Sequence, residues 1–112
     1  MISKSQMLKG ILEGCILALI NDKPAYGYEL SVLLGKKGLG TISEGSIYPV
    51  LLRLQKEKLI EGKMVRSSSG PSRKYYVLTD SGKQALTAFR REWNDLQNGV
   101  EKIFTESKEE KR

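Results

Sequence analysis

The last third of the sequence carries apolar residues at alternating spacings of three and four, and this spacing constrains the fold more than any other feature. It places one narrow apolar stripe along a single helix, as in the seam of a coiled coil. A stripe this long overhangs a domain of 112 residues, so we expect it to pair with a second copy in a homodimer. The alternative is that the helix packs back onto its own domain. The predicted interface residues are Leu86, Phe89, Trp93, Leu96, Val100 and Ile103.

Three further helices are predicted before this one. Residues 4–21 and 25–37 repeat apolar side chains every three or four positions, and Pro24 separates the two segments. A third helix ends near Lys58 and begins after Ser43 or Ser46, since either serine can cap free backbone amides. Pro49 fits a first turn only if Ser46 is the cap, so the sequence leaves this boundary open.

A hairpin is predicted between the third helix and the last. Residues 60–66 and 73–78 favour strands, and the small polar segment 67–72, which contains Gly-Pro, favours a turn. The last helix is expected over residues 81–104, after a cap at residues 79–80, and the charged residues 105–112 are expected to form a flexible tail.

This order of elements predicts a mainly α chain (α+β) with a winged helix-turn-helix. We expect residues 1–79 to form the DNA-binding domain. We expect residues 80–104 to form a dimerisation helix that packs on the first helix of the partner, followed by the tail at residues 105–112.

Composition argues against several classes of function. The chain has no histidine, and Cys15 is its one cysteine, so no histidine-dependent catalytic arrangement, intrachain disulfide or common metal site can form. We expect no enzyme activity and no cofactor. No apolar run approaches the roughly 18 residues that a membrane span needs. We therefore expect a cytoplasmic protein without membrane contact.

The charge balance points to a polyanionic partner. Nineteen basic and thirteen acidic residues give a net charge of +6, and the excess lies before residue 81. In a winged helix the third helix, here called the reader helix, enters the major groove of duplex DNA. Its outward residues would be Ser46, Tyr48, Leu52, Arg53 and Lys56, and the basic connector (Lys36, Lys37) and hairpin (Arg66, Arg73, Lys74) would meet phosphates. The alternatives are a solvated helix face and a hairpin whose charges only block strand pairing.

Three segments carry a resemblance to a known family: Ala-Tyr-Gly-Tyr-Glu-Leu at 25–30, Ser-Glu-Gly-Ser-Ile-Tyr-Pro-Val-Leu-Leu-Arg-Leu-Gln at 43–55, and Gly-Pro-Ser-Arg-Lys-Tyr-Tyr-Val-Leu-Thr at 70–79. From about Lys9 to Ile103 the chain resembles the PadR family of transcriptional regulators, in its compact form with one C-terminal helix. The family's usual glutamate is Gln55 here and its usual glycine is Lys58. The resemblance implies a homodimeric winged-helix protein, usually a repressor, that small molecules such as phenolic acids or lipophilic drugs release from DNA.

The resemblance also assigns residues. It implies that Tyr26 meets the DNA backbone and that Trp93 matches the aromatic residue that stacks on flat ligands in some members. The alternative is that Trp93 packs in the seam without a ligand. Together with the residue-based reading, the predicted DNA-binding set is Tyr26, Lys36, Lys37, Ser46, Tyr48, Pro49, Arg53, Lys56, Arg66, Gly70, Arg73, Lys74 and Tyr75. The predicted effector set is Trp93, Phe89, Leu8, Leu12 and Cys15.

The sequence therefore predicts a sequence-specific, homodimeric repressor that binds a palindromic operator in double-stranded DNA and is released by a small aromatic or lipophilic effector. The alternative is a winged-helix module that binds an acidic protein partner and has no operator specificity. Salt-dependent binding of duplex DNA with an operator preference would separate the two.

Overall fold

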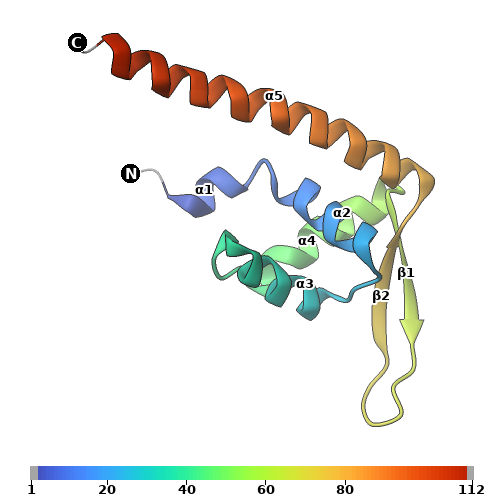
Figure 1. The fold of residues 1–112 in the computed structure, drawn as a ribbon. Helices are drawn as coiled ribbons and strands as arrows, with labels where there is room; N and C mark the ends of the chain where they lie inside the picture. The colour runs from blue at the N-terminus through green and yellow to red at the C-terminus, as the bar shows by residue number, and fades with distance from the viewer. Residues whose placement is uncertain (1–2, 111–112) are drawn as a thin grey trace.

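The computed structural model describes residues 3–110 of the 112, and the side chains of residues 3–106. Short helices and a two-stranded hairpin form one packed unit, and a single long helix leaves it (Figure 1). This arrangement confirms the predicted mainly α fold with a winged helix-turn-helix. In chain order the elements are α1 (Lys4–Leu8), α2 (Leu12–Asp22), α3 (Gly27–Leu34), the π-helical turn η1 (Gly35–Leu39), α4 (Glu44–Lys56), β1 (Ile60–Val65), β2 (Arg73–Leu78) and α5 (Asp80–Glu110).

The prediction of one helix over residues 4–21 was wrong, because this segment forms two helices. The chain turns between Leu8 and Leu12, around Gly10. Glycine destabilises a helix by about 1 kcal/mol relative to alanine. No packing contact offsets this cost at Gly10, because no atom beyond its neighbours in the chain lies within 4 Å of its Cβ position. The break separates α1 from α2 while Leu8 still reaches the core.

The second helix begins at Gly27, two residues later than predicted. The backbone amide of Tyr26 donates to Glu29 Oε1 at 3.1 Å, which caps the first turn. Ala25 instead pairs with Tyr76 of β2, and the Tyr76 amide donates to the Ala25 carbonyl at 2.9 Å. The segment before α3 is therefore attached to the hairpin.

The start of α4, which the sequence left open, lies at Ser43. The Ser46 amide donates to Ser43 Oγ at 3.3 Å, so Ser43 is the N-cap and Pro49 lies inside the helix. Proline has no amide hydrogen, so the carbonyl four residues earlier loses its helical partner. After α4 the chain reverses at Lys58, whose φ of 63° lies in the left-handed region that glycine normally occupies.

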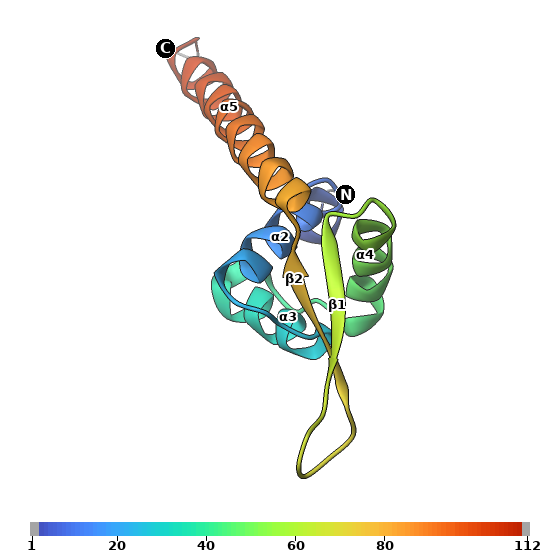
Figure 2. The same ribbon diagram turned by 90° about the vertical axis from the view of Figure 1, so that its right-hand side faces the viewer.

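The hairpin is antiparallel, with Ile60 opposite Leu78 and Val65 opposite Arg73. Its base packs on the helices, since Ile60 and Tyr76 are buried, while the far end projects away from them (Figure 2). The core lies where α2, α3 and α4 meet the base of the hairpin. Its fully buried side chains are Ile16, Leu30, Leu34, Ile47, Leu51, Leu54 and Ile60.

Two glycines allow α5 to pack close to the core, because a larger residue at either position would clash. A Cβ at Gly82 would lie 2.0 Å from the Leu59 carbonyl oxygen, and a Cβ at Gly14 of α2 would lie 2.4 Å from the Phe89 ring. The helix has 31 residues and is therefore about 46 Å long. It packs on α2 and β2 near its start and then extends away from the other elements (Figures 1 and 2).

The last helix was predicted to end at Phe104, but it continues to Glu110. Residues 105–110 of the expected tail are thus helical, and residues 111 and 112 lie outside the described part of the chain. Glutamate and lysine dominate residues 106–110, and both are strong helix formers that need no packing partner. In the portion that the structure describes, no helix has the length and apolar character of a membrane span.

Candidate nucleic-acid interface

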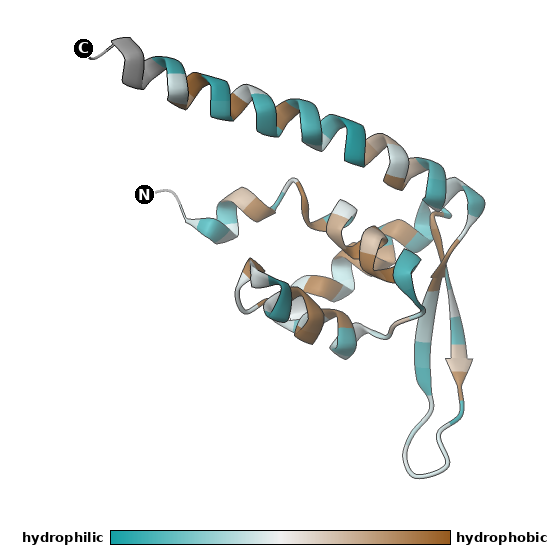
Figure 3. Ribbon diagram, in the orientation of Figure 1, coloured by the Kyte–Doolittle hydropathy of each residue, from teal (hydrophilic) through white to brown (hydrophobic). Residues whose placement is uncertain are grey.

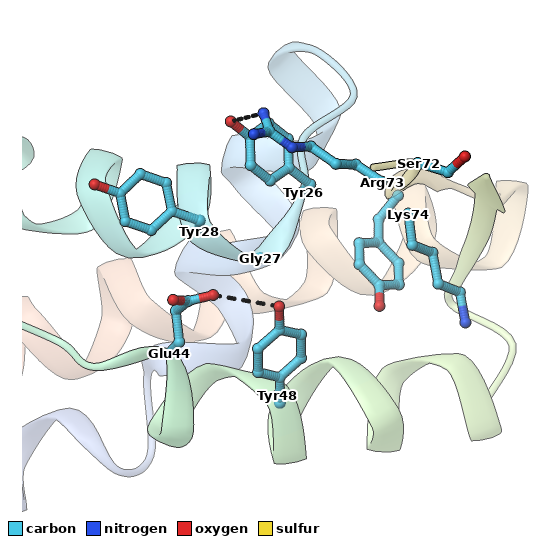
Figure 4. Close-up of a pocket in the computed structure, with 9 residues that line it drawn as sticks. Tyr26, Gly27, Tyr28, Glu44, Tyr48, Ser72, Arg73 and Lys74 are labelled. Carbon is cyan, nitrogen blue, oxygen red and sulfur yellow. Dashed lines mark hydrogen bonds between the residues drawn. The ribbon is translucent and has the colours of Figure 1, made fainter. Parts of the chain in front are cut away.

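Three elements that are distant in sequence meet around one hollow of about 310 Å³ (Figure 4). The start of α3, the first half of α4 and the start of β2 form its walls, and four tyrosines contribute to its surface. We call it the tyrosine hollow. It is lined by Tyr26, Gly27, Tyr28, Glu44, Tyr48, Ser72, Arg73, Lys74 and Tyr76.

Tyr26 fixes the hairpin to α3. The Arg73 guanidinium lies 4.6 Å from the centre of the Tyr26 ring, and Arg73 Nη1 donates to Tyr26 Oη at 2.7 Å. The Tyr75 ring packs edge-on against Tyr26, with the ring centres 5.1 Å apart. Cation–π contacts and edge-on ring pairs are each worth about 0.5–1 kcal/mol at exposed sites, so together they hold the Arg73 cation in one place.

Tyr48 presents a hydroxyl group from the reader helix α4. Tyr48 Oη donates to Glu44 Oε2 at 3.3 Å, one turn earlier on the same helix (Figure 4). Desolvation and, second, the Glu44 carboxylate raise the pKa of Tyr48 above its ordinary value, so the hydroxyl keeps its proton and remains a donor. The Tyr48 ring lies so close to α3 that a Cβ at Gly27 would be 2.9 Å from it. Only glycine at residue 27 allows this approach without a shift.

Lys74 and Arg73 leave β2 on opposite sides, as adjacent residues of a strand do (Figure 4). Arg73 turns to Tyr26, whereas Lys74 Nζ lies 5.8 Å from the centre of the Tyr76 ring. Burial raises the pKa of Tyr76, with a smaller effect from Tyr48. The two cations therefore lie over different tyrosine rings, Arg73 over Tyr26 and Lys74 over Tyr76.

Arg53 does not join the hollow. Its guanidinium is bonded to Glu13 of α2, with Arg53 Nη2 at 2.7 Å and Nε at 2.9 Å from Glu13 Oε2. The two side chains remain 48% and 40% exposed, so the pair contributes at most about 1 kcal/mol. The predicted DNA contact of Arg53 therefore requires that its side chain leave Glu13.

The remaining predicted DNA contacts do not line the tyrosine hollow. Ser46, Pro49 and Lys56 are exposed on α4, beside Leu52, which is 68% exposed although it is a large apolar side chain. Arg66 and Gly70 are exposed in the connection between β1 and β2, and Lys36 and Lys37 are exposed on η1. The structure thus gathers Tyr26, Tyr48, Arg73 and Lys74 in the hollow and Tyr75 beside it, but not Lys36, Lys37 or Arg53.

Sequence reasoning left out five residues that also line the hollow: Gly27, Tyr28, Glu44, Ser72 and Tyr76. Tyr28 lies two residues from Tyr26 at the start of the same helix, so its place beside the predicted contact was a usable signal. Glu44 gave no such signal, because an acidic residue does not suggest contact with a polyanion.

The predicted effector residues do not form one site within a single chain. Phe89 packs on Gly14 of α2, and Trp93 is half-buried on α5. Leu8 and Leu12 line a different hollow, between α1 and α4. Cys15 is half-buried, and burial raises the pKa of its thiol. Across residues 3–106, no three histidine, cysteine or acidic side chains are placed to hold a metal ion.

The apolar stripe of α5 changes character along its length. Leu86 packs on the core, and Phe89 and Trp93 are half-buried. Beyond them Leu96 is 59%, Val100 44%, Ile103 66% and Phe104 64% exposed. Brown bands recur between hydrophilic ones along this part of the helix (Figure 3). Among the described residues nothing covers the second half of the stripe.

Helices α2, α3 and α4, with α4 as the reader helix, and the cationic hairpin define a winged-helix DNA-binding fold. The model of the "Transcriptional regulator PadR-like family" matches residues 16–88. The chain therefore belongs to the PadR-like family of transcriptional regulators, which confirms the resemblance.

Solved structures agree with this assignment. The chain is 55% identical to a PadR-like transcriptional regulator from Bacillus cereus strain ATCC 14579, with 88% of this chain and 96% of that chain covered and a TM-score of 0.81. It is 46% identical to a Streptococcus transcriptional regulator, with the same coverage and a TM-score of 0.78. Bacillus subtilis PadR was solved in complex with operator DNA. The chain is 32% identical to it, with 70% of this chain and 45% of that chain covered and a TM-score of 0.63.

Proposed function

We propose that this regulator binds a palindromic operator as a homodimer and represses transcription, and that a small aromatic or lipophilic effector releases it. The observation that carries DNA binding is the tyrosine hollow, where hydroxyl donors and two cations from three elements face the same space. This set suits phosphate oxygens and base edges, and the Bacillus subtilis relative was solved with operator DNA. Such a role places the protein in the cytoplasm.

In this proposal the first half of α4 enters the major groove. Tyr48 Oη donates its proton to Glu44 Oε2 there, so the Glu44 carboxylate offers an acceptor for a cytosine amino group and the Tyr48 oxygen can accept a second hydrogen bond. Arg73 and Lys74 contact the phosphates beside the groove. These cations supply affinity that falls with salt, whereas the α4 side chains supply the preference for sequence.

The dimer rests on the exposed second half of the α5 stripe. Four large apolar side chains on a helix that extends beyond its own core form a surface that a second copy can cover. An isologous pairing of two α5 helices would relate two reader helices by a two-fold axis. Helices about 34 Å apart read two half-sites one turn of DNA apart, which predicts a palindrome.

The effector proposal rests on Trp93. This ring is half-buried at the point where the stripe passes from covered to uncovered side chains. In a dimer, the ring and its symmetry mate would supply flat walls for a planar molecule. Release from DNA would follow if the occupied seam changes the spacing of the two reader helices.

Fluorescence anisotropy with a duplex from the promoter upstream of the regulator's own gene tests DNA binding. We expect tighter binding than to a shuffled duplex, and we expect Arg73→Ala/Lys74→Ala to weaken both and to lower the salt slope by about two for each half-site. Arg90→Ala/Arg91→Ala, which removes the same charge from exposed positions of α5, is the matched control. Equal loss in both variants, or no operator preference, would contradict the proposal and favour an interaction module for an acidic protein.

A further inference from the structure

We propose that a second hollow, between α1 and α4, is a binding site for a fatty carboxylate within one protomer. Its volume is about 620 Å³, within the range of small-molecule sites. We call it the α1–α4 groove. Among the described residues that line it, none comes from α5 and none belongs to the tyrosine hollow. The proposal is therefore independent of the Trp93 site.

The floor of the groove is aliphatic. Leu8, Leu12, Leu39, Ile42 and Val50 supply its apolar surface, and no lining residue is aromatic. A flat aromatic ligand would find no ring to stack on, whereas each buried CH₂ of a flexible alkyl chain strengthens binding about fourfold. The lining therefore favours an acyl chain.

The rim of the groove is positively charged. Lys4 and Lys9 line it, and among the described residues no acidic side chain does. The other polar groups are four hydroxyl side chains, including Ser43 and Ser46 at the start of α4. A single anionic head group therefore meets two cations and several possible hydrogen-bond partners, without an opposing carboxylate.

The walls are held in place by the chain itself. Ser31 Oγ donates to the Ile42 carbonyl oxygen at 2.5 Å, which fixes the loop between η1 and α4. Gly40 in this loop has a φ of 86°, which favours glycine, and its Cβ position lies 3.9 Å from Lys4 Cδ. The Lys4 side chain thus lies beside the loop, and both line the groove.

Isothermal titration of the full-length protein with decanoate, below its micelle concentration and without DNA, tests the proposal. We expect saturable binding that butyrate does not reproduce, because butyrate keeps the carboxylate but lacks the chain. Lys4→Glu/Lys9→Glu should weaken decanoate binding at least tenfold. Arg90→Glu/Arg91→Glu makes the same charge change on α5, outside the groove, and should leave binding unchanged.

Ser5→Trp is a second variant, which blocks the groove with a bulky ring and keeps both lysines. It should also weaken binding, and circular dichroism confirms that each variant is folded. No decanoate binding, or binding that survives Lys4→Glu/Lys9→Glu and is lost in Trp93→Ala, would overturn the proposal. Because the titration contains no DNA, its result does not depend on whether the regulator binds an operator.

Discussion

Truncation of two side chains on α5 should separate the dimer without unfolding the protomer. Leu96 is 59% and Ile103 66% exposed in the single chain, so Leu96→Ala/Ile103→Ala removes little from the protomer's own core. Alanine also keeps the helix, since it has the highest helix propensity. We therefore expect the loss to appear in association and not in the free energy of unfolding of the isolated chain.

The magnitude follows from the exposed fractions. Full burial of a leucine or isoleucine is worth about 1.5–3 kcal/mol, so covering the exposed part of each gives about 1 kcal/mol. A two-fold dimer contains each residue twice, and the double variant therefore loses about 4 kcal/mol of association free energy. Since about 1.4 kcal/mol corresponds to a tenfold change, the dissociation constant of the dimer should rise about a thousandfold.

Sedimentation velocity over a range of protein concentrations measures this change. Asn98→Ala/Glu101→Ala is the matched control, because these exposed residues lie on the opposite side of α5 and should leave the dimer intact. If Leu96→Ala/Ile103→Ala sediments like the unmodified protein while its helix content is retained, the α5 stripe is not the dimer seam. A loss of helix content in the variant would show that the stripe packs on its own domain.

Three further predictions concern stability. Gly14→Ala should lower the free energy of unfolding by about 1–3 kcal/mol, because the new methyl group would lie 2.4 Å from the Phe89 ring. Gly10→Ala, which has no neighbour within 4 Å, should not lower it. Thermal melts followed by circular dichroism compare the two variants, and equal melting temperatures would refute the close contact. Lys58→Gly should raise the free energy of unfolding by about 0.5–1 kcal/mol in urea titrations, because Lys58 has a φ of 63°, which glycine adopts without steric cost. Glu57→Gly, at a φ of −82°, should lower the free energy of unfolding. Burial raises the pKa of Tyr76, so the folded chain holds this proton more tightly than the unfolded chain. The free energy of unfolding should therefore be unaffected below the ordinary tyrosine pKa of 10.0 and should fall as the pH rises above it. An equal fall in Tyr76→Phe would show that other groups are responsible.

Much of the fold could be predicted because apolar periodicity is a local signal. The reader helix, both strands and the α5 stripe follow from side-chain spacing, since each element must bury one face. The break at Gly10 was not predicted because the apolar spacing continues from Leu8 to Leu12 on both sides of it. The continuation of α5 beyond Phe104 was missed for the opposite reason, since helix propensity alone maintains a segment without an apolar face.

Part of the lining of the tyrosine hollow was predictable residue by residue, but not its arrangement. Tyr48, Arg73 and Lys74 were identified from their chemistry and from the family resemblance, and Tyr26 from the resemblance alone. That Arg73 lies against Tyr26, 47 residues earlier in the chain, depends on how the hairpin docks on α3. The two sides of α4 likewise differ only in their neighbours, so spacing alone could not show that Arg53 faces Glu13.

The sequence by itself determined the order of the elements, the cationic character of the hairpin and the stripe on the last helix, because these depend on residues close together in the chain. The tertiary structure decided which cations are already paired, which tyrosines share one hollow, and that Leu8 and Leu12 line a groove of their own rather than a site with Trp93. The physical reason is that charge and hydrogen-bond partners are set by through-space distance, and packing brings together groups that are dozens of residues apart.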